Sequence, residues 1–136
     1  MYKDFTDMPV WHLSMEVAEI IFGMTKGLPT KEDYGLTSQI RRASVSISAN
    51  IAEAFGRSTP ADKNKFYDYS RGSAFETKSL LLYGKNVGYF TEEDSQMVIE
   101  KLSGIIHDLN KVKLALSSQY ISKPKVQAQS ESQPQS

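Results

Sequence analysis

The sequence predicts an all-α protein, an antiparallel up-down-up-down four-helix bundle with a disordered C-terminal tail. Apolar side chains recur three or four residues apart in four stretches, which is the period of an amphipathic helix. Glycine, proline and threonine separate these stretches at positions that suit helix ends. No stretch alternates apolar and polar residues as a half-buried strand does. A length of 136 residues suits one domain, which we place at residues 1–120, followed by the tail at residues 121–136.

The first helix is expected to begin at Pro9, because a proline at the first helical position sacrifices no hydrogen bond. Gly27 and Pro29 mark its end. Between these points six apolar side chains repeat at helical spacing: Val10, Leu13, Val17, Ile20, Ile21 and Met24.

The second helix is expected over residues 36–55, with Gly56 ending it. Its main apolar seam has spacings of three and four residues, as in a coiled coil, and consists of Leu36, Ile40, Ala43, Ile47, Ile51 and Ala54. Val45, Ala49 and Ala52 form a second apolar face. We expect this helix to be the most buried of the four, and its surplus of small and apolar surface is typical of an interface.

Thr59 and Pro60 predict the start of the third helix, with the threonine as N-cap and the proline in the first turn. This helix is expected to run to about Val87, where Gly88 closes it. Its spacings of three and four residues predict a core seam with a polar centre, made of Phe66, Tyr69, Ser73, Glu76, Leu80, Tyr83 and Val87.

Thr91 is expected to cap the fourth helix, whose first turn is acidic and whose end carries Lys111 and Lys113. That order of charges complements the helix dipole. Its apolar face is expected to comprise Val98, Leu102, Ile105, Leu109, Val112 and Leu116. From Ile121 onward the chain is rich in Gln, Ser and Pro, and it holds too little apolar surface to offset the entropy of ordering.

The composition excludes several classes of protein. There is no Cys, which rules out disulfide scaffolds, cysteine-ligated zinc, iron–sulfur clusters and thiol catalysis. Sixteen basic and sixteen acidic residues give a net charge of zero, which argues against coating nucleic acid through bulk positive charge. The N-terminal segment does not resemble a signal peptide, and no apolar run is long enough to cross a membrane. We therefore expect a cytoplasmic protein with no membrane partner.

The neutral total conceals an uneven distribution of charge. Residues 36–90 hold eight basic and four acidic side chains, whereas residues 1–35 and 91–120 are both net acidic. Six basic residues of this middle region are candidates for one nucleic-acid-binding surface: Arg41, Arg42, Arg57, Lys63, Lys65 and Arg71. The alternative is that they are solvated or paired with acidic helices of the same or a neighbouring chain.

Polar residues also stand at positions that helical spacing assigns to contacts between helices. We expect a structural polar network of Arg42, Asn50, Glu53, Ser73 and Glu76. Because a buried carboxylate needs a partner, the two glutamates are expected to pair with Arg41, Arg42 or Arg71. The functional alternative is a catalytic pair of carboxylates that act as general acid and base.

The sequence predicts neither a metal site nor a cofactor. A di-metal bundle site needs Glu-x-x-His motifs, but Pro9 and Gly104 stand three residues before His12 and His107. His12 and Glu16 lie one helical turn apart, an arrangement that is more often a surface coincidence than a pair of ligands. The chain also has neither a G-x-S-x-G nucleophile motif nor a glycine-rich phosphate loop, so we expect no enzymatic activity.

Residues 34–57, YGLTSQIRRASVSISANIAEAFGR, resemble the signature of a family of small four-helix-bundle proteins found in intervening sequences of large-subunit rRNA genes, which is also labelled ribosomal-protein-like. They are also similar to the accessory variability determinant proteins of diversity-generating retroelements. The similarity covers roughly residues 5–118 and includes Phe5, Val10, Trp11, Phe66, Arg71, Gly72, Ser73, Glu76, Gly88 and Tyr89. The chain departs from the family at Ser48, Ala54 and Lys78, where proline, glycine and an acidic residue are usual. It is neutral, whereas the retroelement proteins are strongly basic.

The resemblance implies a bundle that assembles as a ring-like pentamer and serves as an adaptor for nucleic acid or a reverse transcriptase. Our leading hypothesis is a non-enzymatic homo-oligomeric scaffold, with RNA or DNA as a candidate partner of the basic middle region. The alternative is a protein-binding module that recruits a reverse transcriptase or another nucleic-acid enzyme. A small enzyme that uses Glu53 and Glu76 with Arg42 is the third hypothesis.

Overall fold

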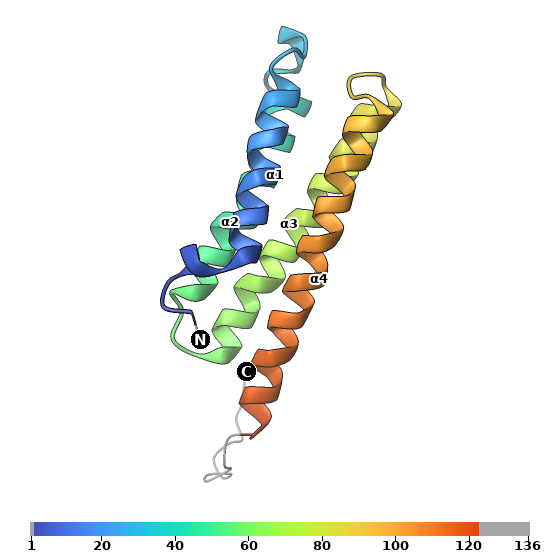
Figure 1. Cartoon of the computed structure of the whole chain (residues 1–136). Coiled ribbons are helices and arrows are strands. Elements are labelled where there is room, and N and C mark those ends of the chain that lie inside the picture. Colours follow the sequence, from blue (N-terminus) through green and yellow to red (C-terminus); the bar gives the residue numbers. More distant parts are fainter. Residues whose placement is uncertain (1, 123–136) are drawn as a thin grey trace.

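The computed structural model describes residues 2–122 and shows four helices that run alternately up and down (Figure 1). These helices are α1 (Pro9–Thr25), α2 (Leu36–Phe55), α3 (Pro60–Asn86) and α4 (Glu92–Ser122). Two short 3₁₀ turns, η1 (Phe5–Asp7) and η2 (Thr30–Glu32), precede α1 and α2. Each helix packs against its neighbours in sequence, and α1 also packs against α4, which closes the bundle.

The predicted all-α bundle is therefore confirmed for the described residues. Helix α4 continues to Ser122, past the expected domain boundary at residue 120. The rest of the tail that we predict to be disordered, residues 123–136, lies outside the described residues. Within residues 2–122, no helix combines the length and apolar character needed to cross a membrane.

The helix starts follow the local signals in the sequence. Pro9 and Pro60 occupy the first turns of α1 and α3, where the missing N–H leaves no helical bond unmade. The hydroxyl of Thr59 accepts a hydrogen bond from the backbone N–H of Asp62 at 3.1 Å. Thr91 caps α4 in the same way, accepting from the backbone N–H of Asp94 at 3.0 Å.

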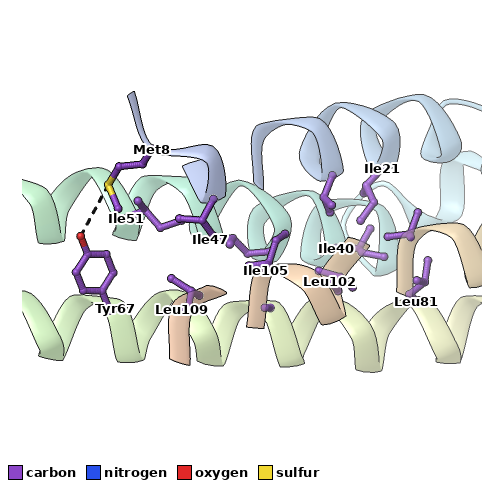
Figure 2. Close-up of a cluster of buried hydrophobic side chains, with 14 of the residues drawn as sticks. Met8, Ile21, Ile40, Ile47, Ile51, Tyr67, Leu81, Leu102, Ile105 and Leu109 are labelled. Carbon is purple, nitrogen blue, oxygen red and sulfur yellow. Dashed lines mark hydrogen bonds between the residues drawn. The ribbon is translucent and has the colours of Figure 1, made fainter. Parts of the chain in front are cut away.

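The core runs along the bundle axis and takes residues from all four helices (Figure 2). The whole predicted seam of α2 is buried, from Leu36 to Ala54. In α4 the N-terminal part of the predicted face, from Val98 to Leu109, is buried. Val112 and Leu116, nearer the C-terminal end, are partly exposed and pack against the core. In α1 the predicted residues divide into three that are buried (Val10, Val17 and Ile21) and three that pack at the margin of the core (Leu13, Ile20 and Met24).

The predicted core seam of α3 is wrong by one residue. The buried row consists of Tyr67, Ser70, Ala74, Thr77, Leu81 and Gly84. Most of these side chains are small, which lets α3 approach α2 closely enough for the Ser70 hydroxyl to donate to the backbone carbonyl of Ile47 at 2.8 Å. The bulkier predicted row lies to one side, with Tyr69 and Tyr83 each about half exposed, at 50% and 54%.

Candidate interaction surface

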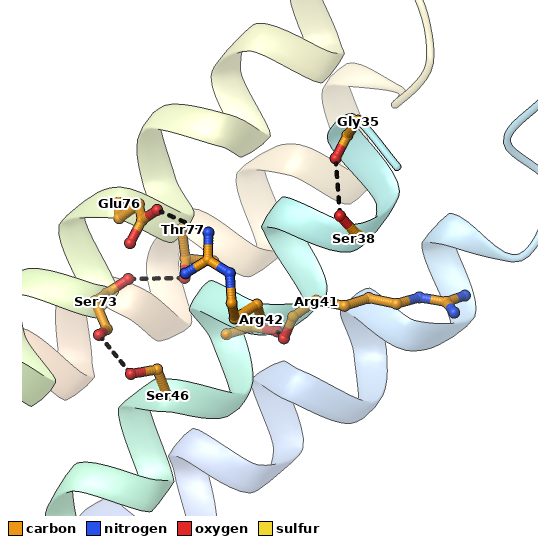
Figure 3. A network of polar contacts seen from close by, with 9 residues as sticks. Gly35, Ser38, Arg41, Arg42, Ser46, Ser73, Glu76 and Thr77 are labelled. Carbon is orange, nitrogen blue, oxygen red and sulfur yellow. Dashed lines mark hydrogen bonds and ion pairs between the residues drawn. The ribbon is translucent and has the colours of Figure 1, made fainter. Parts of the chain in front are cut away.

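The six candidate basic residues do not gather on one surface. Arg41 extends over α1, where its Nε donates to Thr25 Oγ1 at 2.7 Å and its guanidinium stacks on the Phe22 ring at 4.3 Å. Arg42, its neighbour in sequence, reaches in another direction, toward Glu76 of α3 (Figure 3). Consecutive residues of a helix point about 100° apart, so this divergence follows from helical geometry.

Two basic residues hold the α2–α3 turn together. Arg57 forms a 2.7 Å ion pair with Glu53 and places its guanidinium over the ring of Phe66 at 4.4 Å. The Nζ of Lys63 donates to the backbone carbonyl of Phe55 at 2.8 Å, at the C-terminal end of α2. A cation at this end of a helix satisfies free carbonyls and complements the helix dipole.

Arg71 is directed toward α4. It donates to the Asn110 side-chain oxygen at 2.6 Å and forms a 3.2 Å ion pair with Asp68 of its own helix. Lys65 is exposed, and the Arg42 side chain is 66% exposed. Arg42 and Lys65 are therefore the two candidates with the most accessible charge, and the other four make short contacts within the chain.

The structure brings together part of the expected polar network. Ser73 of α3 donates to the Ser46 hydroxyl at 2.9 Å (Figure 3). The Asn50 amide donates to the same hydroxyl at 2.9 Å. Arg42 and Glu76 lie 3.9 Å apart, at the outer limit of an ion pair. These contacts join the outer edges of α2 and α3.

Glu53 is not part of this network, because it pairs with Arg57 on its own helix. Both expected carboxylates lie at the surface, with 49% of the Glu53 side chain and 46% of the Glu76 side chain exposed. The expectation that they are buried between helices is therefore wrong. The side chains of Glu53 and Glu76 extend toward solvent, and small residues occupy the contact between α2 and α3.

His12 and Glu16, whose spacing we interpret as a surface coincidence, contact different partners. The Nε2 of His12 lies 2.7 Å from the backbone carbonyl of Thr6, and Glu16 forms a 3.0 Å ion pair with Lys101 of α4. Within residues 2–122 there is no cluster of three potential metal ligands. A shallow cavity of about 330 Å³ lies between the N-terminal segment and α4, lined by Tyr2, Met8, Pro9, Val10, Asp108, Lys111 and Val112.

The outer surface of α2 and α3 exposes several large apolar side chains. We call it the α2–α3 face and define it by Arg42, Val45, Ala49, Tyr69, Glu76, Tyr83 and Val87. Val45 and Val87 are 55% and 49% exposed, similar to the two tyrosines. Tyrosine is enriched at protein interfaces because it combines a large apolar ring with a polar tip. The α3 part of this face keeps the three-and-four spacing of a packing seam although no helix of the described chain covers it.

The fold and this surface define a small antiparallel four-helix bundle with a partly apolar outer face. The chain belongs to the family described as 23S rRNA-intervening sequence protein, whose sequence profile matches residues 6–111.

One solved structure with the same fold is a protein with unknown function from the S23 ribosomal protein family of Bacteroides thetaiotaomicron. The two chains are 24% identical, the TM-score is 0.69, and the match covers 76% of this chain and 97% of the other. At this identity the likeness concerns the fold. Among curated proteins, none matches this sequence.

Proposed function

We propose that the protein is a non-enzymatic, homo-oligomeric helical scaffold whose copies meet through the α2–α3 face. One observation carries the proposal. The aromatic row of α3, which has the spacing of a helix-packing seam, lies at the surface. Apolar surface with that regular spacing is buried effectively by another helix. A second copy of the chain is a suitable partner, because Arg42 and Glu76 give the same face both signs of charge.

The proposal is also favoured over catalysis by the placement of the carboxylates. An acid–base pair needs Glu53 and Glu76 to meet a common substrate, with Arg42 beside them. Glu53 is instead held by Arg57, and Glu76 lies next to Arg42 on the surface. The family resemblance implies five copies, and the mass of the assembly in solution tests that number.

Light scattering and sedimentation of the full chain test the proposal. The wild type is expected to have a mass that is a multiple of the chain mass of 15.3 kDa. Tyr83→Glu should weaken association by about tenfold or more, because it places a charge in the interface. Phe75→Glu is the matched control, since Phe75 is 52% exposed on α3 but lies outside the α2–α3 face. A wild type that remains monomeric at high concentration would refute the proposal.

Contact with RNA or DNA is the second part of the proposed function and rests on Lys65, which is exposed and is not among the residues that define the α2–α3 face. Repetition in an oligomer would multiply this exposed charge, and affinity should then fall steeply with salt. In a titration at low salt, Lys65→Glu should weaken binding, whereas Lys111→Glu on α4 should have less effect. Absence of binding by the wild type would refute contact with nucleic acid and leave only the scaffold part of the proposed function.

Recruitment of a reverse transcriptase or another nucleic-acid enzyme is the alternative function, which the resemblance to retroelement accessory proteins implies. Co-purification of such an enzyme with the full chain, lost in Tyr83→Glu and retained in Phe75→Glu, would favour recruitment through the α2–α3 face.

A further inference from the structure

The two connections at one end of the bundle, which we call the apex, are joined by a single carboxylate. Residues 26–35 link α1 to α2 and residues 87–91 link α3 to α4, and both lie at the same end of the bundle (Figure 1). One oxygen of Glu32 accepts a hydrogen bond from the backbone N–H of Leu36, the first residue of α2, at 3.2 Å. The other oxygen accepts from the Tyr89 hydroxyl at 2.9 Å. Glu32 therefore holds the start of α2 and the α3–α4 turn at once.

The local sequence places this carboxylate. Glu32 ends the 3₁₀ turn η2, and its backbone carbonyl accepts from the N–H of Gly35 at 2.9 Å. A Cβ at Gly35 would lie 2.9 Å from the carboxylate oxygen that holds α2, so glycine leaves room for that contact. Gly35 is also the N-cap of α2 and makes no side-chain cap. Glu32 therefore supplies the acceptor that a capping side chain gives to the first N–H groups of a helix.

The residues next to this contact also join the two connections through apolar packing. Leu36 and Phe90 are buried, and the side chains of both border Gly84 near the end of α3. The backbone N–H groups of Tyr89 and Phe90 both donate to the Gly84 carbonyl, at 2.8 Å and 3.4 Å. The hydrogen bond to Glu32 raises the pKa of the Tyr89 hydroxyl, which therefore stays protonated and able to donate. The apex thus combines one polar contact with an adjoining apolar one.

The opposite end of the bundle is held by separate contacts. At the α2–α3 turn Arg57 pairs with Glu53 at 2.7 Å, and the Nζ of Lys63 donates to the backbone carbonyl of Phe55 at 2.8 Å. These contacts involve neither of the two apex connections. Segments of a protein that are held by separate contacts can open separately. Loss of the contact at the apex can therefore loosen that end while the α2–α3 turn stays folded.

We propose that the contact between Glu32 and Tyr89 is a latch that closes the apex, and that its release frees the α1–α2 connection and the α3–α4 turn together. In the closed state the start of α2 is buried, whereas the open state exposes Leu36, Thr37 and Phe90 to solvent. The rest of the bundle is folded in both states. A ligand or partner that binds one state more tightly than the other shifts the balance between them. The latch does not depend on the proposed self-association.

Thiol labelling measures the opening, because the chain has no Cys of its own. Thr37, in the first turn of α2, is 8% exposed, and within residues 2–122 its Oγ1 has no hydrogen-bond partner, so Thr37→Cys breaks no hydrogen bond. The reagent DTNB should react slowly with this thiol. Adding Tyr89→Phe should raise the reaction rate by about tenfold, because a hydrogen bond to a charged group is lost. An unchanged rate would refute the latch.

Two matched variants make the labelling result specific. Ser48→Cys places a thiol at a 4% exposed position about three turns further along α2, and Tyr89→Phe should leave its reaction rate unchanged. Tyr34→Phe removes the hydroxyl of a 98% exposed tyrosine two residues from Glu32, and it should leave the labelling of Thr37→Cys unchanged. If Tyr89→Phe accelerated the labelling of both thiols equally, the opening would be general unfolding and the proposal of a local latch would be wrong.

Amide hydrogen exchange tests whether the two connections open together. Tyr89→Phe should speed exchange of the Leu36 amide, and Glu32→Ala should speed exchange of the Phe90 amide, each by about tenfold. In the double variant the Phe90 amide should exchange no faster than in Glu32→Ala, because the latch is already open. A Leu36 amide that is unaffected by Tyr89→Phe, or additive effects in the double variant, would show that the two connections open independently.

Discussion

Gly84 shows how one residue controls the turn from α3 to α4. A Cβ at this position would lie 2.3 Å from an atom of the Phe90 ring and 3.3 Å from Leu36 Cδ2. Phe90 is 6% exposed and so has little space into which to move. Gly88, with a φ of 91°, reverses the chain between Gly84 and Phe90, in a conformation that favours glycine.

Gly84→Ala is expected to lower the free energy of unfolding by about 1–3 kcal/mol, because the buried Phe90 ring must shift. The matched control is Gly72→Ala, since Gly72 is exposed in the same helix and a methyl group there would meet no atom within 4 Å. That substitution should stabilise the protein by roughly 0.5–1 kcal/mol through helix propensity. Urea denaturation measures both, and equal effects of the two substitutions would contradict the close approach at Gly84.

Tyr67 makes stability sensitive to alkaline pH. Burial raises the pKa of its hydroxyl above the ordinary value, since the charged phenolate is poorly solvated there. The folded state then holds this proton more tightly than the unfolded state. Its contribution is fully present below the unfolded pKa of about 10 and is lost as pH rises through the folded pKa.

Tyr67→Phe should therefore flatten the fall in stability between mildly and strongly alkaline pH. The measurement is urea denaturation of the wild type and the variant at several pH values. Tyr83→Phe is the control, because it removes a hydroxyl from the same helix at a position that is 54% exposed. Identical pH profiles for Tyr67→Phe and the wild type would show that the buried phenol is not the responsible group.

At the scale of the element, α3 carries two parallel rows with the spacing of packing seams. The inner row places Ser70 and Ala74 against the bundle, and the outer row places Tyr69 and Tyr83 at the surface. Hydrophobicity favours the outer row as the core, whereas close helix packing favours the inner row. Packing prevails because Ser70 can satisfy its hydroxyl on the α2 backbone while the two helices approach closely.

Ala74→Leu tests which row of α3 is inside. Ala74 is fully buried, so overpacking should cost about 1–3 kcal/mol of unfolding free energy. Phe75→Leu, at the neighbouring exposed position, should change stability by less than about 0.5 kcal/mol. Thermal or urea unfolding measures the difference. If Ala74→Leu left the free energy of unfolding unchanged, the result would indicate that the outer row, not the inner row, is the core seam.

Helix boundaries were predictable because their signals are local. The proline, threonine and glycine that bound α1 and α3 act on the adjacent backbone. The partners of the charged residues were not predictable in the same way. Arg41 donates a hydrogen bond to Thr25 on α1, and Arg71 donates one to Asn110 on α4. In both cases the two residues are distant in the sequence.

At the scale of the whole molecule, the composition makes the net charge zero, and several of the opposite charges also pair between helices. Ion pairs between helices, such as Lys101 with Glu16 and Lys113 with Asp68, connect α4 to its two neighbours. Such exposed pairs contribute little stability individually. The more distinctive property of the surface is that the aromatic row of α3 is exposed beside α2, which is the basis of the proposed assembly.

Self-association predicts that thermal stability depends on protein concentration. If only the folded chain assembles, the wild-type Tm should rise with concentration by mass action. Tyr83→Glu should have a Tm that does not change over the same range, while the control Phe75→Glu should follow the wild type. Differential scanning calorimetry at several concentrations provides the measurement. A wild-type Tm independent of concentration would contradict assembly through the folded state.

The sequence alone determined the number of helices, their approximate ends and the core seam of α2, because hydrophobic period and capping residues act within one helix. Only the tertiary structure decided which row of α3 faces inward and which basic residues keep an accessible charge. The physical reason is that these outcomes depend on neighbouring helices. Two rows with the same spacing are equivalent along the sequence, and the close approach of α2 distinguishes them.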